Sequence, residues 1–344
     1  MREPSRRGGG LSAVAFYLLL PVVAALVVLP LVAGNDWFGD MVTFFRPHVA
    51  GLAFCLLILA ALPPRPAKFA LALPVLIAAL VPIVLPRAPT AVARAPGDLR
   101  VLTANVLVNN SDFARLPAEI AALSPDIVVL QEALYGWPEV MQKLPGYPYV
   151  VGPDIARWNG IIVASRFPLR ATIMDEVPDV DHHIGGSRAI RVEVDRPGIT
   201  RPLVLYGLHA PTPRTRAGWE VRNAYLGRLA ERIRAEATGT DIIVAGDWNT
   251  PIWSPAYARF LADAGLRATE RSLLPEPTRV FREFGAPRFL GATVDHIAVS
   301  SDIGVAALDV GSDFGSDHLP VIADLSLPAT TTAHSGQPAA VHAE

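Results

Sequence analysis

The chain has 344 residues and a formal net charge of −2, and 51% of its residues are hydrophobic. Its mean hydropathy of +0.34 is high for a purely soluble protein, and the single cysteine, Cys55, excludes a disulfide within the chain. The charge is divided: residues 1–97 carry a net +5 and residues 98–328 a net −6. An acidic second part argues mildly against a tight, sequence-independent grip on nucleic acid.

Three apolar segments open the chain, at residues 11–34, 47–62 and 69–86. A helix needs roughly 20 apolar residues to cross the hydrocarbon core of a bilayer. The first segment exceeds the roughly 7–15 apolar residues of a cleaved signal peptide, although Ser5-Arg6-Arg7 gives it a basic start. We therefore predict a membrane anchor over residues 1–86 with about three transmembrane helices. A smaller number of spans, or a removed signal peptide, is the alternative.

The short loops around these segments predict their orientation. Arg2, Arg6 and Arg7 precede the first segment, and Arg65 and Lys68 precede the third. The positive-inside rule then places these two ends in the cytoplasm. With three crossings, the rest of the chain lies on the non-cytoplasmic side of a plasma (inner) membrane, as part of a multi-pass protein.

The proline-rich residues 87–97 are typical of a short, stiff linker, and the small, polar residues 329–344 of a disordered tail. Between them, β-branched runs predict strands and amphipathic runs predict helices. Strands are expected at 99–104, 127–131, 160–165, 188–194, 203–208, 241–245, 293–299 and 319–325, and helices at 112–123, 217–237 and 254–264. This alternation predicts one layered α/β domain over residues 98–328.

Polar residues recur immediately after the apolar strands of this domain. Ligands bind at strand ends in layered α/β proteins, because rigid strands hold side chains at fixed positions. Two acidic-histidine pairs join this set, at 295–296 and 317–318. The candidates are Asn105, Glu132, His209, Asp247, Asn249, Asp295, Asp317 and His318.

Oxygen ligands without cysteine suit a hard cation such as Mg²⁺ or Mn²⁺ better than a structural zinc ion. A hard cation beside histidine is suited to phosphoryl chemistry, because the cation neutralises developing charge while a carboxylate orients or deprotonates water. Each residue alone has a simpler explanation. Asp247 and Asn249, for example, fit an Asx-turn or a helix cap before Pro251.

The order of the motifs favours a catalytic site over these simpler explanations. The motifs lie over about residues 99–325 and are TANV, VVLQE, GLHAP, AGDWN, VDHI and GSDHLP. Together they resemble the endonuclease/exonuclease/phosphatase superfamily, whose members include pancreatic-type deoxyribonucleases and neutral sphingomyelinases. The chain looks like a membrane-anchored bacterial-type member. The resemblance implies a deoxyribonuclease I-like four-layer α/β sandwich, in which two mainly antiparallel or mixed sheets are flanked by helices.

The resemblance also implies roles for the matching residues. One or two Mg²⁺ or Mn²⁺ ions would be held by Asn105, Glu132 and Asp317. Asp247 would activate water, and His209 would stabilise the transition state. Asp295 would orient and charge His318 over the phosphate. Asn249 would bind the scissile phosphate.

Other residues are weaker candidates. Arg188 begins a strand and is either a phosphate clamp or a strand-edge salt bridge. Asn159 is a turn residue or a substrate contact. The remaining candidates, His182, His183, His296, Trp219 and Arg222, fit surface or packing roles better than catalysis.

Two substrates for a phosphodiester hydrolase stay open: nucleic acid and a phospholipid headgroup of the sphingomyelin type. Loop 271–292 is the best candidate for a phosphate-rich partner, because its arginines alternate with phenylalanines. Nucleic acid is slightly favoured, and tethering at a bilayer strengthens the case for the lipid relative to a soluble relative. A non-catalytic membrane scaffold is a third possibility. The sequence predicts no oligomeric state.

Overall fold

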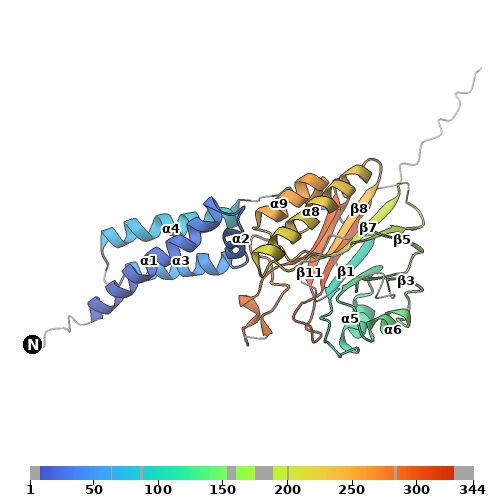
Figure 1. The fold of residues 1–344 in the computed structure, drawn as a ribbon, viewed down its shortest axis with the longest axis horizontal. Helices are drawn as coiled ribbons and strands as arrows, with labels where there is room; N and C mark the ends of the chain where they lie inside the picture. Colours follow the sequence, from blue (N-terminus) through green and yellow to red (C-terminus); the bar gives the residue numbers. More distant parts are fainter. Residues whose placement is uncertain are drawn as a thin grey trace, which may run out of the picture.

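The computed structural model describes residues 8–62, 64–85, 88–152, 160–174, 189–199, 201–282 and 285–328. Helices form an elongated N-terminal part, and the remainder forms an α/β part beside it (Figure 1). Some of the predictions fall outside the described residues: those for Asn159, His182, His183, Arg188 and the tail 329–344.

Four helices make up the N-terminal part: α1 (Gly8–Val32), α2 (Trp37–Thr43), α3 (Arg46–Ala60) and α4 (Pro66–Val84). By length and composition, α1 and α4 could each cross a membrane. The pair α2 and α3 is bent by 75° and passes the same test as one broken span. Within the described chain, the number of possible spans is therefore two, or three if the bent pair counts as one.

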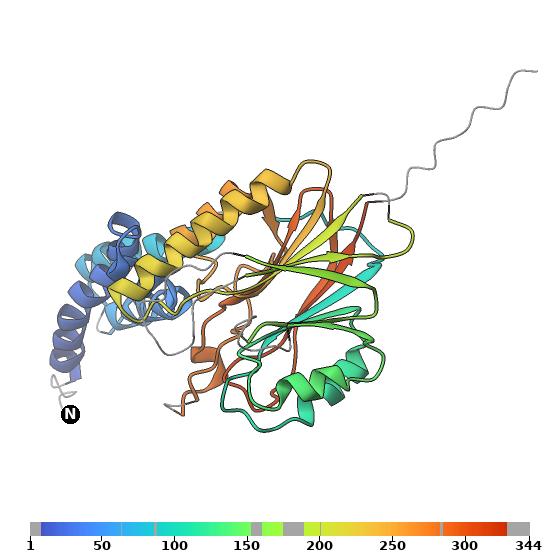
Figure 2. The same cartoon turned by 45° about the vertical axis from the view of Figure 1, so that its right-hand side comes forward.

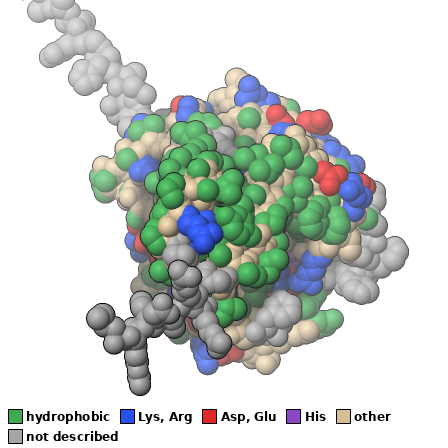
Figure 3. Space-filling model, turned by 90° about the vertical axis from the view of Figure 1, so that its left-hand side faces the viewer, with side chains coloured by type: hydrophobic (Ala, Val, Ile, Leu, Met, Phe, Trp, Pro, Cys, Tyr) green, Lys and Arg blue, Asp and Glu red, His purple; other side chains and the backbone are tan. Residues whose placement is uncertain are grey.

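Apolar side chains cover the outside of this helical part as well as its inside. Phe16, Leu56 and Ala72 are buried between α1, α3 and α4, whereas Leu11 is 78% exposed and Val32 76% exposed. Viewed end-on, hydrophobic side chains dominate the surface (Figure 3). Water-soluble monomers rarely expose so large an apolar patch, so this surface is suited to lipid.

Two six-stranded mixed sheets form the α/β part. The first has the order β11-β12-β1-β2-β4-β3, and the second has the order β5-β6-β7-β8-β10-β9. Only β1 with β2 and β7 with β8 pair in parallel among the named strand pairs. In the first sheet the strands are β1 (Leu99–Asn105), β2 (Ile127–Gln131), β3 (Tyr149–Val151), β4 (Ile162–Ser165), β11 (Gly304–Val310) and β12 (Val321–Ser326). In the second they are β5 (Leu169–Ile173), β6 (Ile190–Val194), β7 (Leu203–His209), β8 (Asp241–Asp247), β9 (Leu266–Ala268) and β10 (Asp295–Ser300).

The sheets pack face to face and helices cover their outer faces (Figure 2). Val101 and Val129 of the first sheet meet Leu205 and Ile243 of the second in the central core. Helices α5 (Arg115–Leu123) and α6 (Trp137–Gln142) cover the first sheet. Helices α8 (Arg216–Glu236) and α9 (Pro255–Ala264) cover the second. The expected four-layer sandwich is confirmed.

Several elements were not expected from the sequence, namely α2, β3, β5, α6, β9, β11 and the short 3-10 helix η2 (Arg288–Leu290). Strand β3 has only three residues, and the edge strand β11 is built from glycine, alanine and aspartate as much as from β-branched residues, so neither gives a clear strand signal. Helix α6 has only six residues, which is too short for a clear helical period. The predicted boundaries of the central strands agree with the structure to within about two residues, as expected at element ends.

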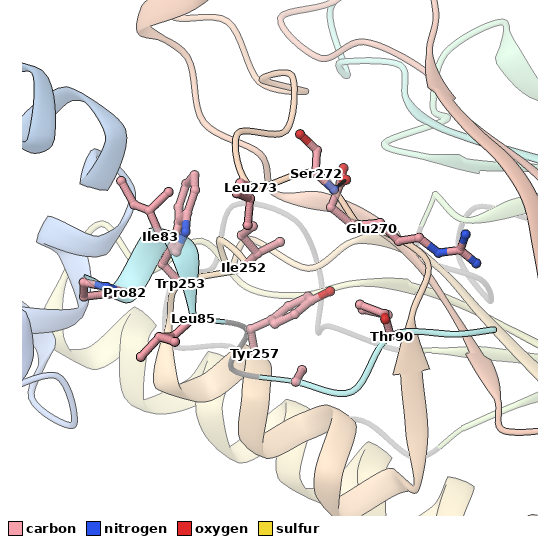
Figure 4. Close-up of a pocket in the computed structure, with 13 residues that line it drawn as sticks. Pro82, Ile83, Leu85, Thr90, Ile252, Trp253, Tyr257, Glu270, Ser272 and Leu273 are labelled. Carbon is pink, nitrogen blue, oxygen red and sulfur yellow. Dashed lines mark hydrogen bonds between the residues drawn. The ribbon is translucent and has the colours of Figure 1, made fainter. Parts of the chain in front are cut away.

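The segment that joins the two parts lies along both sheets. The Ala91 N–H donates to the Ala268 carbonyl of β9 at 2.8 Å, and the Arg94 N–H donates to the Val305 carbonyl of β11 at 3.2 Å. A cavity of about 80 Å³ lies beside it, lined by Pro82 and Ile83 at the end of α4 and by Tyr257 of α9 (Figure 4). None of the candidate catalytic residues lines this cavity.

Candidate active site

Strand pairing brings the candidate residues to one edge of the sandwich. In the second sheet, Asp247 at the end of β8 pairs in register with His209 at the end of β7 and with Asp295 at the start of β10. In the first sheet, Asn105 at the end of β1 pairs with Gln131, the residue before Glu132. The same edge of both sheets therefore presents side chains to one space.

Asn105 connects the two sheets across this space. Its amide nitrogen donates to Glu132 Oε1 at 2.9 Å and to Asp247 Oδ2 at 3.1 Å. Its carbonyl oxygen accepts the Leu107 N–H at 3.0 Å. In this orientation Asn105 holds two carboxylates together, and its oxygen would face a cation only after the amide turned over.

Glu132 is held as an ionised carboxylate. Oε1 accepts from Asn105, and Oε2 accepts the Val108 N–H at 3.0 Å. Burial acts to raise the pKa of Glu132, but the charge of His209 and these hydrogen bonds outweigh it and lower the pKa. Its φ of 55° is unusual for a residue other than glycine.

Two histidines approach the buried carboxylate of Asp247. His209 Nε2 lies 3.6 Å from Asp247 Oδ2, and His318 Nε2 lies 3.7 Å from the same oxygen. His209 Nε2 is also 3.8 Å from Glu132 Oε1. Burial and the neighbouring Asp295 raise the pKa of Asp247, which suits a carboxylate that takes up a proton.

Asp295 and His318 form a buried pair behind Asp247. His318 Nδ1 donates to Asp295 Oδ2 at 2.8 Å. Burial alone would lower the pKa of His318, but Asp295 and then Asp247 raise it to about 9. His318 is therefore a cation at neutral pH, and its Nε2 proton is directed at the space beside Asp247.

Asn249 has a left-handed backbone conformation with a φ of 46°, and it hydrogen-bonds to both carboxylate oxygens of Asp247. Its backbone N–H donates to Asp247 Oδ1 at 2.8 Å. Its side-chain amide donates to the Ala210 carbonyl at 2.8 Å and, over a longer 3.3 Å, to Asp247 Oδ2. The longer of these side-chain contacts is the weaker one.

The donor set fits a hard divalent cation. Ligand atoms of Asp247, Asp295 and His318 lie within 4.8 Å of one another, and Asp295 Oδ1 is buried without a hydrogen-bond partner among the described residues. Glu132 adds a further carboxylate beside Asp247. Asp317, a predicted metal ligand, instead accepts from Arg279 Nη2 at 3.0 Å. Because His318 is protonated, the donors left for a cation are carboxylate oxygens, and carboxylates without a thiol favour Mg²⁺ or Mn²⁺.

The arginines of loop 271–292 have partners within the loop or elsewhere in the chain. Arg279 pairs with Asp317, Arg282 with Asp313 and Arg288 with Glu276. Arg271 donates to the Ala91 carbonyl at 3.0 Å. This pairing weakens the expectation that the loop presents a basic surface to a phosphate-rich partner.

Two residues expected to be structural are buried. His296 Nε2 lies 2.7 Å from the Thr250 carbonyl oxygen and its ring packs on Trp248 and Tyr257. Burial lowers the pKa of His296 to about 4. Arg222, expected on the surface or in packing, is fully buried beside Asp40 and Asn249. No sequence signal links it to Asp40, which lies 182 residues earlier.

Comparisons with known proteins agree with this architecture. A family model described as endonuclease/exonuclease/phosphatase family matches residues 102–318. No curated protein sequence matches the chain significantly.

Solved structures share the fold. An endonuclease/exonuclease/phosphatase from Beutenbergia cavernae is 23% identical, with a TM-score of 0.53 over 68% of this chain and 72% of that one. One from Bacteroides vulgatus is 19% identical, with a TM-score of 0.55 over 67% and 98%. Beta toxin from Staphylococcus aureus with bound magnesium ions is 14% identical, with a TM-score of 0.52 over 66% and 99%.

Proposed function

Because the chain belongs to the endonuclease/exonuclease/phosphatase family, we propose that it is a membrane-tethered, Mg²⁺- or Mn²⁺-dependent phosphodiester hydrolase. The observation that carries the proposal is the convergence of Glu132, Asp247, His209 and His318 at one edge of the sandwich. Family members are generally phosphoester hydrolases. The magnesium ions of the related beta toxin support the choice of cation.

Glu132 would be the principal ligand of the cation. Asn105 would complete the site with its amide turned over, and Asp317 would do so on leaving Arg279. The cation, when bound, polarises the phosphoryl group and neutralises developing charge. Asp247 receives the proton of the attacking water, since its raised pKa suits a general base. His209 and cationic His318 donate to the phosphoryl oxygens, which become more negative in the transition state.

Asn249 and Asp295 act beside these groups. Asn249 orients Asp247 and offers its amide to the scissile phosphate. Asp295 fixes the ring of His318 and keeps it charged. Arg188, at the start of a predicted strand, would contact a substrate phosphate through its guanidinium.

The substrate proposed first is nucleic acid on the non-cytoplasmic side of the plasma membrane. The second candidate is a phospholipid headgroup, which the packing of loop 271–292 against the anchor favours. His48 Nε2 of α3 lies 2.8 Å from the Phe289 carbonyl oxygen, and the rings of Phe45 and Phe281 are 5.7 Å apart. Phe289 is 70% exposed beside this contact, near the surface that lipid would cover.

One assay tests the proposal. The full-length protein in detergent is given plasmid DNA, sphingomyelin or bis-p-nitrophenyl phosphate, with Mg²⁺ or Mn²⁺. We expect turnover of at least one substrate, its loss with EDTA, and its loss in Asp247→Ala. Asp302→Ala, at an exposed ion pair with Arg201, is the matched control and should keep activity. Turnover that survives Asp247→Ala contradicts the mechanism, and silence on every substrate supports a scaffold.

A further inference from the structure

Helix α2 of the N-terminal part lies against helix α8 of the α/β part (Figure 1). The contact includes the Trp37 indole N–H, which donates to the Pro213 carbonyl at 2.9 Å, and a pair between Arg216 and Asp36 at 3.1 Å. At its centre Asp40 is buried. A buried carboxylate is unfavourable unless it is paired and hydrogen-bonded.

Asp40 is paired with Arg222 of α8, whose side chain is fully buried. Asp40 Oδ2 also accepts the Trp219 indole N–H at 2.8 Å. Asn223 Oδ1 accepts from the same guanidinium, from Nε at 3.1 Å and from Nη2 at 2.9 Å. The guanidinium is planar and its donors have fixed directions, so these partners determine where Nη1 points.

Arg222 Nη1 donates to the carbonyl oxygen of Asn249 at 3.1 Å. Asn249 has a left-handed backbone, which persists only where the surroundings over-determine it. Its N–H in turn fixes Asp247 Oδ1. A continuous chain of contacts therefore runs from Asp40 in α2 through Arg222 and Asn249 to the carboxylate of Asp247.

We propose that Asp40 and Arg222 are positioning residues, through which the N-terminal helices hold Asn249 and Asp247 in their catalytic geometry. The N-terminal part is then a structural component of the active site as well as an anchor. The inference rests on the proposed function of Asn249 and Asp247. The claim that Asp40 and Arg222 fix the conformation of residues 247–251 is independent of that function and can be tested without a substrate.

The first test measures amide hydrogen exchange by mass spectrometry on the full-length protein in detergent. Asp40→Asn keeps a hydrogen-bond acceptor and removes the charge. We expect faster exchange in 247–251, with β1 unchanged. Arg216→Gln, which breaks only the exposed pair with Asp36, is the matched control and should leave 247–251 unchanged. Unaltered exchange in Asp40→Asn overturns the inference, whatever the substrate.

If exchange rises throughout the α/β part, the Asp40→Asn variant has unfolded and cannot test a local effect. The milder variant Trp219→Phe then provides the test. That variant removes one donor to Asp40 and should produce a smaller, local rise in 247–251. An unchanged 247–251 segment in Trp219→Phe then overturns the inference.

The second test is a double-mutant cycle on turnover. A misplacement near 1 Å at a catalytic group lowers rates by up to about 100-fold, so Asp40→Asn should lower kcat about 10- to 100-fold with little change in KM. In an Arg222→Gln background the same change should cause almost no further loss, because the guanidinium that reaches the Asn249 carbonyl is already gone. Full additivity of Asp40→Asn and Arg222→Gln overturns the route from Asp40 through Arg222. Absence of turnover in the wild type would instead refute the proposed function, and the exchange result would still decide the inference.

Discussion

The pair between Asp295 and His318 gives a prediction whose size follows from the structure. In Asp295→Asn a charge 2.8 Å from His318 Nδ1 disappears, while an acceptor for the same hydrogen bond remains. The ordinary pKa of histidine is 6.5 and that of His318 is about 9. At about 1.4 kcal/mol per unit, the surroundings favour the cation by about 3 kcal/mol.

Without Asp295, burial becomes the dominant influence and the pKa of His318 falls. Each unit by which it falls below the assay pH removes about a factor of ten in the cationic fraction. We expect kcat/KM at pH 7.5 to drop by about 10- to 100-fold. The wild type loses activity as pH rises through about 9, and the variant should lose it at lower pH, so acidification restores part of its activity.

The assay is the pH dependence of kcat/KM on bis-p-nitrophenyl phosphate at saturating Mg²⁺ for the wild type and Asp295→Asn. His318→Gln, which lacks the titrating group, is the control and should show no such alkaline limb. An alkaline limb that stays in place in Asp295→Asn would refute the assignment of Asp295 as the residue that keeps His318 charged.

Three further predictions concern stability and metal binding. The pKa of His296 is about 4 in the fold and about 6.5 when unfolded. Its contribution to the free energy of unfolding is therefore complete above pH 6.5 and is lost as pH falls toward 4. Over this range the free energy of unfolding of the wild type should fall by up to about 3 kcal/mol relative to that of His296→Gln. Melting temperatures in detergent at each pH follow this change, and parallel curves of melting temperature against pH for the two proteins would contradict it. Gly246→Ala should prevent folding, since φ is 148° and the new Cβ would lie 1.9 Å from the Leu208 oxygen; normal yield and a normal melting temperature would contradict it. Glu132→Gln should weaken Mg²⁺ binding by at least about tenfold in titration calorimetry, because one carboxylate ligand is lost, and unchanged affinity would exclude Glu132 as a ligand.

The sequence predicts that the candidate residues lie at strand ends because the signal for this position is local. A polar residue directly after an apolar strand is visible in a few letters, as at Asn105, Asp247 and Glu132. Parallel pairing of β1 with β2 and of β7 with β8 then brings these ends together.

Contacts between distant segments were not predictable in this way. On α8, Arg222 follows a charged helical pattern that is typical of a solvated face, and only the tertiary structure places Asp40 against it. The same holds for loop 271–292, whose arginines form a basic pattern in sequence. In the fold, two of these arginines form ion pairs with Asp313 and Asp317.

The joining segment determines how far the enzyme can reach. A free tether of similar length would let the catalytic edge sweep a volume above the bilayer. Here the backbones of Ala91 and Arg94 are hydrogen-bonded to the edge strands β9 and β11, and α2 packs on α8. If the N-terminal helices cross the membrane as proposed, the active site stays at one height and one tilt. Its substrates are then selected first by where their phosphodiester lies relative to the lipid surface, and only afterwards by their chemistry.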